Sequence, residues 1–230
     1  YGMLPFFIFG FLMTAFPRWM NGKEILKRHY VPAFVLLMLG NIGFYAGLLT
    51  DHYILPAALS CTLAGWGIVL YALLRVLLVT AAYDKRHAKV ILAALGMGWC
   101  GVAAFFIWLL TDIPAWLHFS RQAGLWLFLV PVFASVAHRM IPFFTSGALP
   151  HLHVTSPYWP WWVMLASSVA HGLMQLADLS SWLWLCDAPL AVASLYLTHA
   201  WGSRHTLRFP MLGVLHVGFA WLGFAMLLFT

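Results

Sequence analysis

Long apolar stretches alternate with short polar connections along the whole chain. A helix rises ~1.5 Å per residue, so about 20 residues are needed to cross a hydrocarbon core of ~30 Å. The pattern therefore predicts eight membrane-spanning helices, over residues 1–17, 31–50, 54–80, 90–110, 122–138, 159–178, 182–199 and 211–229. The fifth stretch is the shortest and contains Pro131, which makes its limits the hardest to place.

Composition agrees with this pattern. Of the 230 residues, 63% are hydrophobic and 8% are charged, which leaves too little polar surface to cover a soluble globule. We therefore expect an all-α helix bundle that forms a single transmembrane domain and is surrounded by a lipid bilayer. The chain starts at Tyr1 without an initiator Met and stops at Thr230 with no polar tail, so we expect it to be cut at both ends from a larger bundle.

The basic residues are sorted between the connections. Eleven of the twelve Lys and Arg residues fall in or beside the odd-numbered connections, over residues 18–29, 83–89, 139–158 and 200–210. The even-numbered connections carry only Arg121 but hold four carboxylates, those of Asp51, Asp112, Asp178 and Asp187. By the positive-inside rule the odd-numbered connections are cytoplasmic. The same sorting argues against a nucleic-acid partner, because the charges lie in separate short connections and not on one continuous patch.

The second stretch contains a small-residue pattern. Gly43 and Gly47 are four residues apart, and Gly40 lies beside them. Small residues at this spacing allow two helix backbones to approach closely in a membrane. The pattern predicts a tight helix–helix contact on this face.

The predicted depth divides the histidines inside the stretches into two groups. His138, His199 and His216 lie near the cytoplasmic ends of their stretches, whereas His118 and His171 lie in the outer half. Polar groups inside a span are costly, and neutral imidazole is a good ligand for haem iron or copper. A single mononuclear site cannot use both groups, because they lie at different depths.

Ser167, His171, Gln175 and Asp178 form a polar stripe, with spacings of four, four and three that place them on one helical face. If His171 binds a metal through one ring nitrogen, Gln175 or Asp178 could take up the second role locally, although Asp178 is too far along the helix for direct contact with His171. A polar seam that only joins neighbouring helices explains the same stripe, and both interpretations stay open.

Further candidate ligands lie near Pro142. Arg139 could pair with a haem propionate or satisfy the free carbonyls of a helix end. His151 and His153 could chelate a metal, and the ten methionines could serve Cu(I), although both residue types are also ordinary loop and packing residues. The chain shows no phosphate-binding glycine motif, no nucleophile elbow and no paired membrane carboxylates.

Three stretches, in this order, resemble motifs of the NnrS family. GFLMTAFPRW (10–19) resembles the family's GFLLTA-x-P-x-W span end, and HRMIPFFT (138–145) is similar to its R-x-x-P-F-F-T turn. LHVGFAWL (215–222) resembles its LH-[VL]-G-[YF]-A-W-L segment. The resemblance implies a multi-pass protein of the bacterial inner membrane that contains haem and copper. It also implies a role in denitrification or nitric-oxide stress, and a larger bundle of about twelve spans of ~20 residues.

By this resemblance, His216 is the first choice for a haem or metal ligand, with His138 and His199 in the same leaflet. Arg139 would pair with an anion or a propionate, and His171 and His118 would form a second, outer site. Nitric oxide or its iron adducts would be the ligand. Whether the protein turns over a substrate, senses one or protects iron sites is not decided by these residues.

Two other functions fit the same sequence. The protein could be a transporter or permease for a small solute, a metal or haem, with the histidines lining the path. It could also be a non-catalytic assembly factor of the membrane.

Overall fold

The structure, a computed structural model, describes residues 1–152 and 154–230. These residues form helices joined by short connections, with no strand among them, so the predicted all-α class is confirmed. The chain divides into two compact units, Tyr1–Gly124 and Leu125–Thr230. The structure describes each unit by itself, so the single transmembrane domain expected from the sequence stays a prediction.

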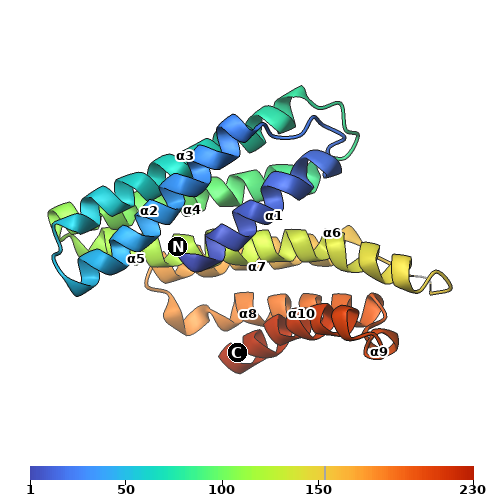
Figure 1. Cartoon of the computed structure of the whole chain (residues 1–230). Helices are drawn as coiled ribbons and strands as arrows, with labels where there is room; N and C mark the ends of the chain where they lie inside the picture. Colours follow the sequence, from blue (N-terminus) through green and yellow to red (C-terminus); the bar gives the residue numbers. More distant parts are fainter. Residues whose placement is uncertain (153) are drawn as a thin grey trace. The chain divides into compact units, whose positions relative to one another are not determined.

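The first unit contains five helices: α1 (Met3–Trp19), α2 (Lys27–Leu49), α3 (Ile54–Val79), α4 (Arg86–Thr111) and α5 (Pro114–Gln122). Figure 1 shows α2 and α3 running side by side over most of their length. Helix α1 packs against α3 through the rings of Phe9 and Trp66, whose centroids are 4.8 Å apart in an edge-to-face arrangement. Helix α3 is therefore the element on which both α1 and α2 rest.

The glycines of α2 explain its close contact with α3. A Cβ atom added at Gly40 would lie 2.8 Å from the carbonyl oxygen of Ala58, and one at Gly43 would lie 3.1 Å from the Ala58 Cβ. At Gly47 a Cβ would lie 2.8 Å from Leu55 Cδ2. No side chain fits at the first of these positions without moving backbone, so the tight contact predicted from the small-residue pattern is confirmed.

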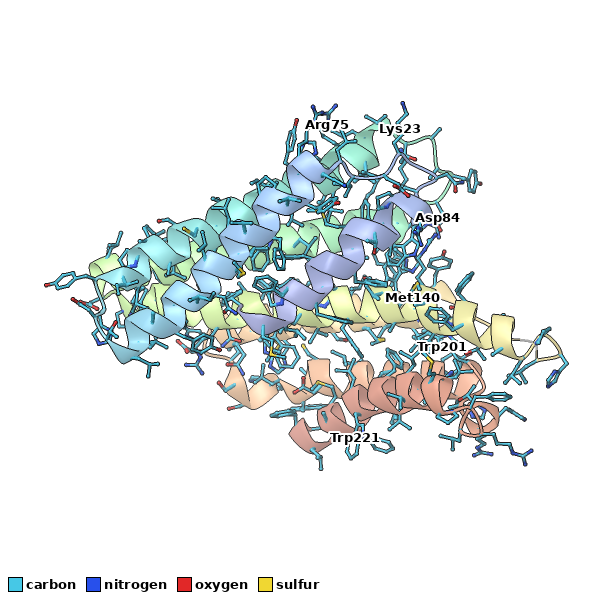
Figure 2. The ribbon with its side chains drawn as sticks, in the orientation of Figure 1. Lys23, Arg75, Asp84, Met140, Trp201 and Trp221 are labelled. Atoms are coloured by element: carbon cyan, nitrogen blue, oxygen red, sulfur yellow. The ribbon has the colours of Figure 1, made fainter. Side chains whose placement is uncertain are left out.

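The basic connections of the first unit meet at one end of it. The hydroxyl of Thr80, at the end of α3, donates a hydrogen bond to the carbonyl oxygen of Met20, at the end of α1. Figure 2 shows Lys23, Arg75 and Asp84 at this same end. The connections that follow α1 and α3 therefore share one surface, as the threading of alternating spans requires.

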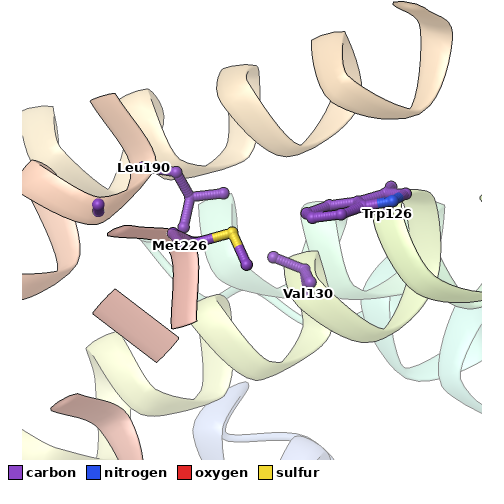
Figure 3. Close-up of a cluster of buried hydrophobic side chains, with 5 residues drawn as sticks. Trp126, Val130, Leu190 and Met226 are labelled. Atoms are coloured by element: carbon purple, nitrogen blue, oxygen red, sulfur yellow. The ribbon is translucent and has the colours of Figure 1, made fainter. Parts of the chain in front are cut away.

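The second unit contains four longer helices, α6 (Val130–Ala148), α7 (Tyr158–Leu176), α8 (Trp184–Ala200) and α10 (Pro210–Phe229). Two short helices, η2 (Ser180–Trp182) and α9 (Ser203–Thr206), lie in its connections. Part of its core is a cluster of five buried apolar side chains from α6, α8, α10 and the segment before α6, shown in Figure 3 (Trp126, Val130, Leu190, Ala191, Met226). These contacts join the beginning of α6 to the end of α10.

The predicted limits of the fifth span are wrong. Instead of a helix over 122–138, α5 continues through a π-helix, η1 (Ala123–Leu129), directly into α6, so that residues 114–148 are helical without a break. Pro131 explains the π-helix, because it lacks an N–H group and its ring clashes with the carbonyl four residues earlier, which widens the preceding turn. His138 and Arg139 therefore lie inside α6, and the first ten residues of the predicted connection 139–158 are helix.

Among the described residues, five helices are long and apolar enough to cross a membrane: α2, α3, α4, the continuous helix 114–148, and α10. The chain is thus of the multi-pass membrane type. The other three predicted spans coincide with α1, α7 and α8, which are shorter or more polar, with 17, 19 and 17 residues. The count of eight spans stays a prediction.

Candidate functional site

His216 lies on the inner face of α10 and is only 1% exposed. Pro210 stands at the first turn of this helix, where its missing N–H group costs nothing. The Nε2 atom of His216 is 3.0 Å from the Oγ1 atom of Thr145 on α6. This contact joins the beginning of α10 to the end of α6.

The hydrogen bonds of Thr145 determine which nitrogen of His216 carries the proton. Thr145 Oγ1 is 2.8 Å from the carbonyl oxygen of Ile141, one turn earlier, and a carbonyl oxygen can only accept. Because a hydroxyl has a single proton, Thr145 donates to Ile141 and accepts from the Nε2–H group of His216. The Nδ1 atom of His216 then carries a lone pair. It is buried, and no described residue gives it a hydrogen bond.

His138 on α6 is also buried, and it contacts the beginning of α7 and the end of α8. Its Nε2–H group donates to the carbonyl oxygen of Pro157, 3.0 Å away, immediately before α7. Its ring packs against Trp161, with ring centroids 5.7 Å apart, and against Trp201, with centroids 6.0 Å apart. His138 therefore fixes the beginning of α7 and the end of α8 against α6.

His171 forms a buried carboxylate–imidazole pair. Its Nδ1 atom is 2.6 Å from Oδ1 of Asp187 on α8, and the side chains are 4% and 1% exposed. The indole ring of Trp126 stacks on the imidazole with a centroid distance of 3.5 Å. Ser168 holds this segment in place, because its hydroxyl donates to the Trp126 carbonyl oxygen within the π-helix. A backbone carbonyl oxygen of the π-helix thus accepts a hydrogen bond from α7.

The partner of His171 comes from a neighbouring helix and not from its own polar stripe. Asp178 lies beyond the end of α7, exposed and in a left-handed conformation (φ 57°), so its carboxylate cannot face the core. Asp187, which the sequence analysis assigned to a connection, is instead inside α8. The signal that could have found it is a lone carboxylate within the apolar stretch 182–199, where an unpaired charge is costly.

The two buried sites lie at opposite ends of the second unit. Trp126 touches His171 just before α6, whereas Thr145 touches His216 near the end of α6. At ~1.5 Å per residue these two points are roughly 28 Å apart along the helix. One metal centre cannot use both His171 and His216.

The Thr145–His216 bond also joins two of the three sequence motifs. Thr145 ends the stretch 138–145, and His216 lies in the stretch 215–222. The model of one protein family, described as NnrS protein, matches residues 1–230, the whole chain. The chain belongs to the NnrS family. No curated protein and no solved structure matches it.

The remaining candidate site residues that the sequence analysis assigned to this NnrS protein are His199, Arg139, His118, His151 and His153. His199 is exposed in the last turn of α8, away from the buried cluster around His138. Arg139 is half-buried inside α6. His118 belongs to α5 of the first unit, so its pairing with His171 stays a prediction. Of the proposed chelating pair, His151 is exposed and His153 lies outside the described residues.

The second unit of this NnrS protein holds two kinds of potential metal ligand, a buried imidazole nitrogen and a pair of sulfur atoms. Among the described residues, no three His, Cys, Asp or Glu side chains converge in a way that could hold a metal ion. His216 offers a single buried imidazole lone pair, one nitrogen donor that could hold a metal or a haem iron. Two soft donors also meet in the second unit, the Sγ atom of Cys186 and the Sδ atom of Met174, 3.4 Å apart. Thiolate and thioether sulfur select Cu(I).

Proposed function

We propose that this protein is a haem- and copper-binding member of the NnrS family, located in the bacterial inner membrane and acting in the response to nitric oxide or in denitrification. Its basic connections lie on the cytoplasmic side. Family membership supports the biological role, and the environment of His216 supports the haem. The buried, unpartnered Nδ1 atom of His216 is the observation that carries the proposal.

A buried nitrogen lone pair without a partner is costly, because it loses its hydrogen bond to water and receives none from the protein. In His216 only the Nδ1 atom lacks a partner among the described residues. The Nε2 atom is hydrogen-bonded to Thr145, which also fixes the orientation of the ring. Neutral imidazole with one nitrogen held by an acceptor is the usual state of a metal-ligating histidine. A metal on Nδ1 removes the cost.

Thr145 and Arg139, both on α6, would have different tasks in this site. Thr145 holds the Nε2–H group and thereby the tautomer and the ring plane. The surrounding apolar side chains keep water away, so that an ion or a diatomic ligand meets a low dielectric constant. Arg139, from the preceding turns of α6, is the proposed partner of a propionate or another anion. Haem held there would supply an iron able to bind nitric oxide.

For copper, the chain offers Cys186 and Met174. A metal–thiolate bond is about 2.3 Å long, so two sulfur ligands on one ion are separated by up to about 4.6 Å. The sulfur atoms are now 3.4 Å apart, and the three rotatable bonds of Met174 allow them to move apart. Cys186 would hold the ion as a thiolate, having given up its thiol proton, as metal-ligating cysteines do.

The first experiment uses the full-length gene product, purified from membranes. We expect a haem absorption band near-stoichiometric with protein, and copper by metal analysis. His216→Ala should lose most of the haem because the imidazole that would hold it is removed. It should keep its copper, whose proposed donors are Cys186 and Met174, and should insert into the membrane normally.

His199→Ala is the matched control, since it removes an exposed imidazole in the last turn of α8. It should keep both cofactors. Full haem retention in His216→Ala would overturn the assignment of this residue. A preparation without haem that takes up a solute in vesicles would overturn the proposed function in favour of a transporter.

A further inference from the structure

The first sequence motif, GFLMTAFPRW (10–19), belongs to the first unit, whereas His138, His171 and His216 belong to the second. It lies on α1 and lines one side of a cavity of about 640 Å³ within the first unit. The opposite side is formed by α2, mainly Val31, Phe34 and Leu37. We call this cavity the α1–α2 groove. Its volume is in the range of small-molecule sites, about 300–1,000 Å³.

The groove exists because α1 and α2 both rest on α3 and leave space between them. Its floor is formed by four buried apolar side chains, Phe9, Ala33, Leu37 and Val69. The rings of Phe6 and Phe34 meet edge to face across its far end, with centroids 5.6 Å apart. Gly10 widens its wall, because nothing lies within 4 Å of the place where a Cβ atom would stand.

The other end of the groove is polar and positively charged. Arg18, in the last turn of α1, is exposed there, and Glu24 and Tyr30 also line the cavity. Glu24 contributes one negative charge, but the same connection and the first turn of α2 add Lys23, Lys27 and Arg28. This is also the end at which the connections after α1 and α3 meet (Figure 2). The groove is therefore apolar along its length with a net positive mouth.

We propose that the α1–α2 groove binds an anionic phospholipid, with an acyl chain against Phe9 and Val69 and the phosphate at Arg18. An apolar slot of this kind suits a hydrocarbon chain, and the positive mouth suits an anionic headgroup. The lengths also agree. Phe6 to Arg18 covers roughly 18 Å of helix, and one leaflet of a ~30 Å core is about 15 Å deep.

The test fills the groove without disturbing its walls. Gly10→Leu places a side chain in open space, and leucine is the better helix former. The probes are phosphatidylglycerol and phosphatidylcholine, added to the purified full-length protein, and native mass spectrometry counts the lipid that each chain retains. Displacing about two buried methylene groups corresponds to about tenfold weaker retention of phosphatidylglycerol.

Gly96→Leu is the matched control, because Gly96 lies on α4, outside the groove, and also faces open space. It should retain phosphatidylglycerol like the wild type. Arg18→Gln should reduce the preference for phosphatidylglycerol over phosphatidylcholine by about fivefold, the effect of one basic residue at an anionic surface.

Three results would overturn the proposal. The first is equal phosphatidylglycerol retention in wild type and Gly10→Leu. The second is equal retention of the two lipids by the wild type, because charge selection would then be absent. The third is a Gly10→Leu variant that keeps its lipid but loses haem absorption, which would make haem the occupant of the groove.

Discussion

At the scale of single residues, the buried histidines His216 and His171 each depend on a partner from another helix. Thr145 has one proton to give, and by giving it to Ile141 it determines the tautomer of His216. Asp187 does the same for His171 through a contact of 2.6 Å. In the proposed metal sites, the chemistry of each imidazole would thus be set by a side chain that does not itself bind the metal.

Thr145→Val tests this role at nearly constant volume. Without the hydroxyl, Nε2 of His216 has no acceptor, so ring plane and tautomer are no longer held. We expect haem affinity to fall by about 10–100-fold, the usual effect of removing such a partner. The measurement is the rate of haem transfer to an excess of an apo-globin, together with the position of the absorption maximum.

Thr145→Ser serves as the rescue, because it keeps the hydroxyl and loses a methyl group. It should restore the wild-type spectrum and most of the affinity. If the Val and Ser variants behave alike, Thr145 acts only through packing and the proposed tautomer is wrong.

At the scale of helices, small residues decide which surfaces approach. Helices α2 and α3 are in close contact because Gly40, Gly43 and Gly47 leave no Cβ atoms between them. Helix α1 has bulky Phe6 and Phe9 toward the same neighbours, and a groove remains beside it. The π-helix before α6 is a second local device, since it frees the Trp126 carbonyl oxygen for Ser168.

Gly40→Ala should destabilise the first unit. The new Cβ would lie 2.8 Å from the carbonyl oxygen of Ala58, a backbone atom, so the two helices must separate. Overpacking of this kind costs about 1–3 kcal/mol. The midpoint of denaturation in detergent, followed by tryptophan fluorescence, measures the loss.

Gly96→Ala provides the comparison, since a Cβ there meets open space. Its free energy of unfolding should stay equal or rise by up to about 1 kcal/mol, because alanine favours the helix over glycine. Equal stability of the Gly40→Ala variant and the wild type would show that the α2–α3 contact tolerates separation.

At the scale of the whole molecule, the connections that are predicted to be cytoplasmic gather at one end of each unit. In the first unit, the connections after α1 and α3 lie at the same end. In the second unit, Leu152 of the connection after α6 lies beside Gly202 after α8. Each unit thus brings the two connections that are predicted to be cytoplasmic to one end, as alternating spans require, and in the second unit the basic residues of this end are Arg204 and Arg208 of the connection after α8.

Labelling from the two sides of the membrane tests the proposed orientation. Lys23→Cys should react with a membrane-impermeant maleimide only after spheroplasts are permeabilised, because its connection is cytoplasmic. Asp51→Cys, in the connection between α2 and α3, should react in intact spheroplasts. Wild type, with its own three cysteines, gives the background. The reverse pattern of labelling would invert the topology.

The sequence by itself determined the helical class, most helix positions and the histidines worth examining. Apolar stretches identify helices for lipid because the free energy of transfer adds up residue by residue, whatever the neighbours are. The match of the whole chain to the NnrS family was likewise visible in three short motifs. The ends of the helices were harder to predict from the sequence. The fifth stretch was misplaced because Pro131 widens a turn instead of ending the helix.

Only the tertiary structure decided the partners. His216 was found by its motif, but Thr145 lies 71 residues away, and His171 uses Asp187 instead of the polar residues on its own helix face. Which side chains meet depends on how helices pack and rotate against each other, a property that hydropathy does not encode. The chain's pattern thus sets which residues are buried in the membrane, and packing sets which of them act together.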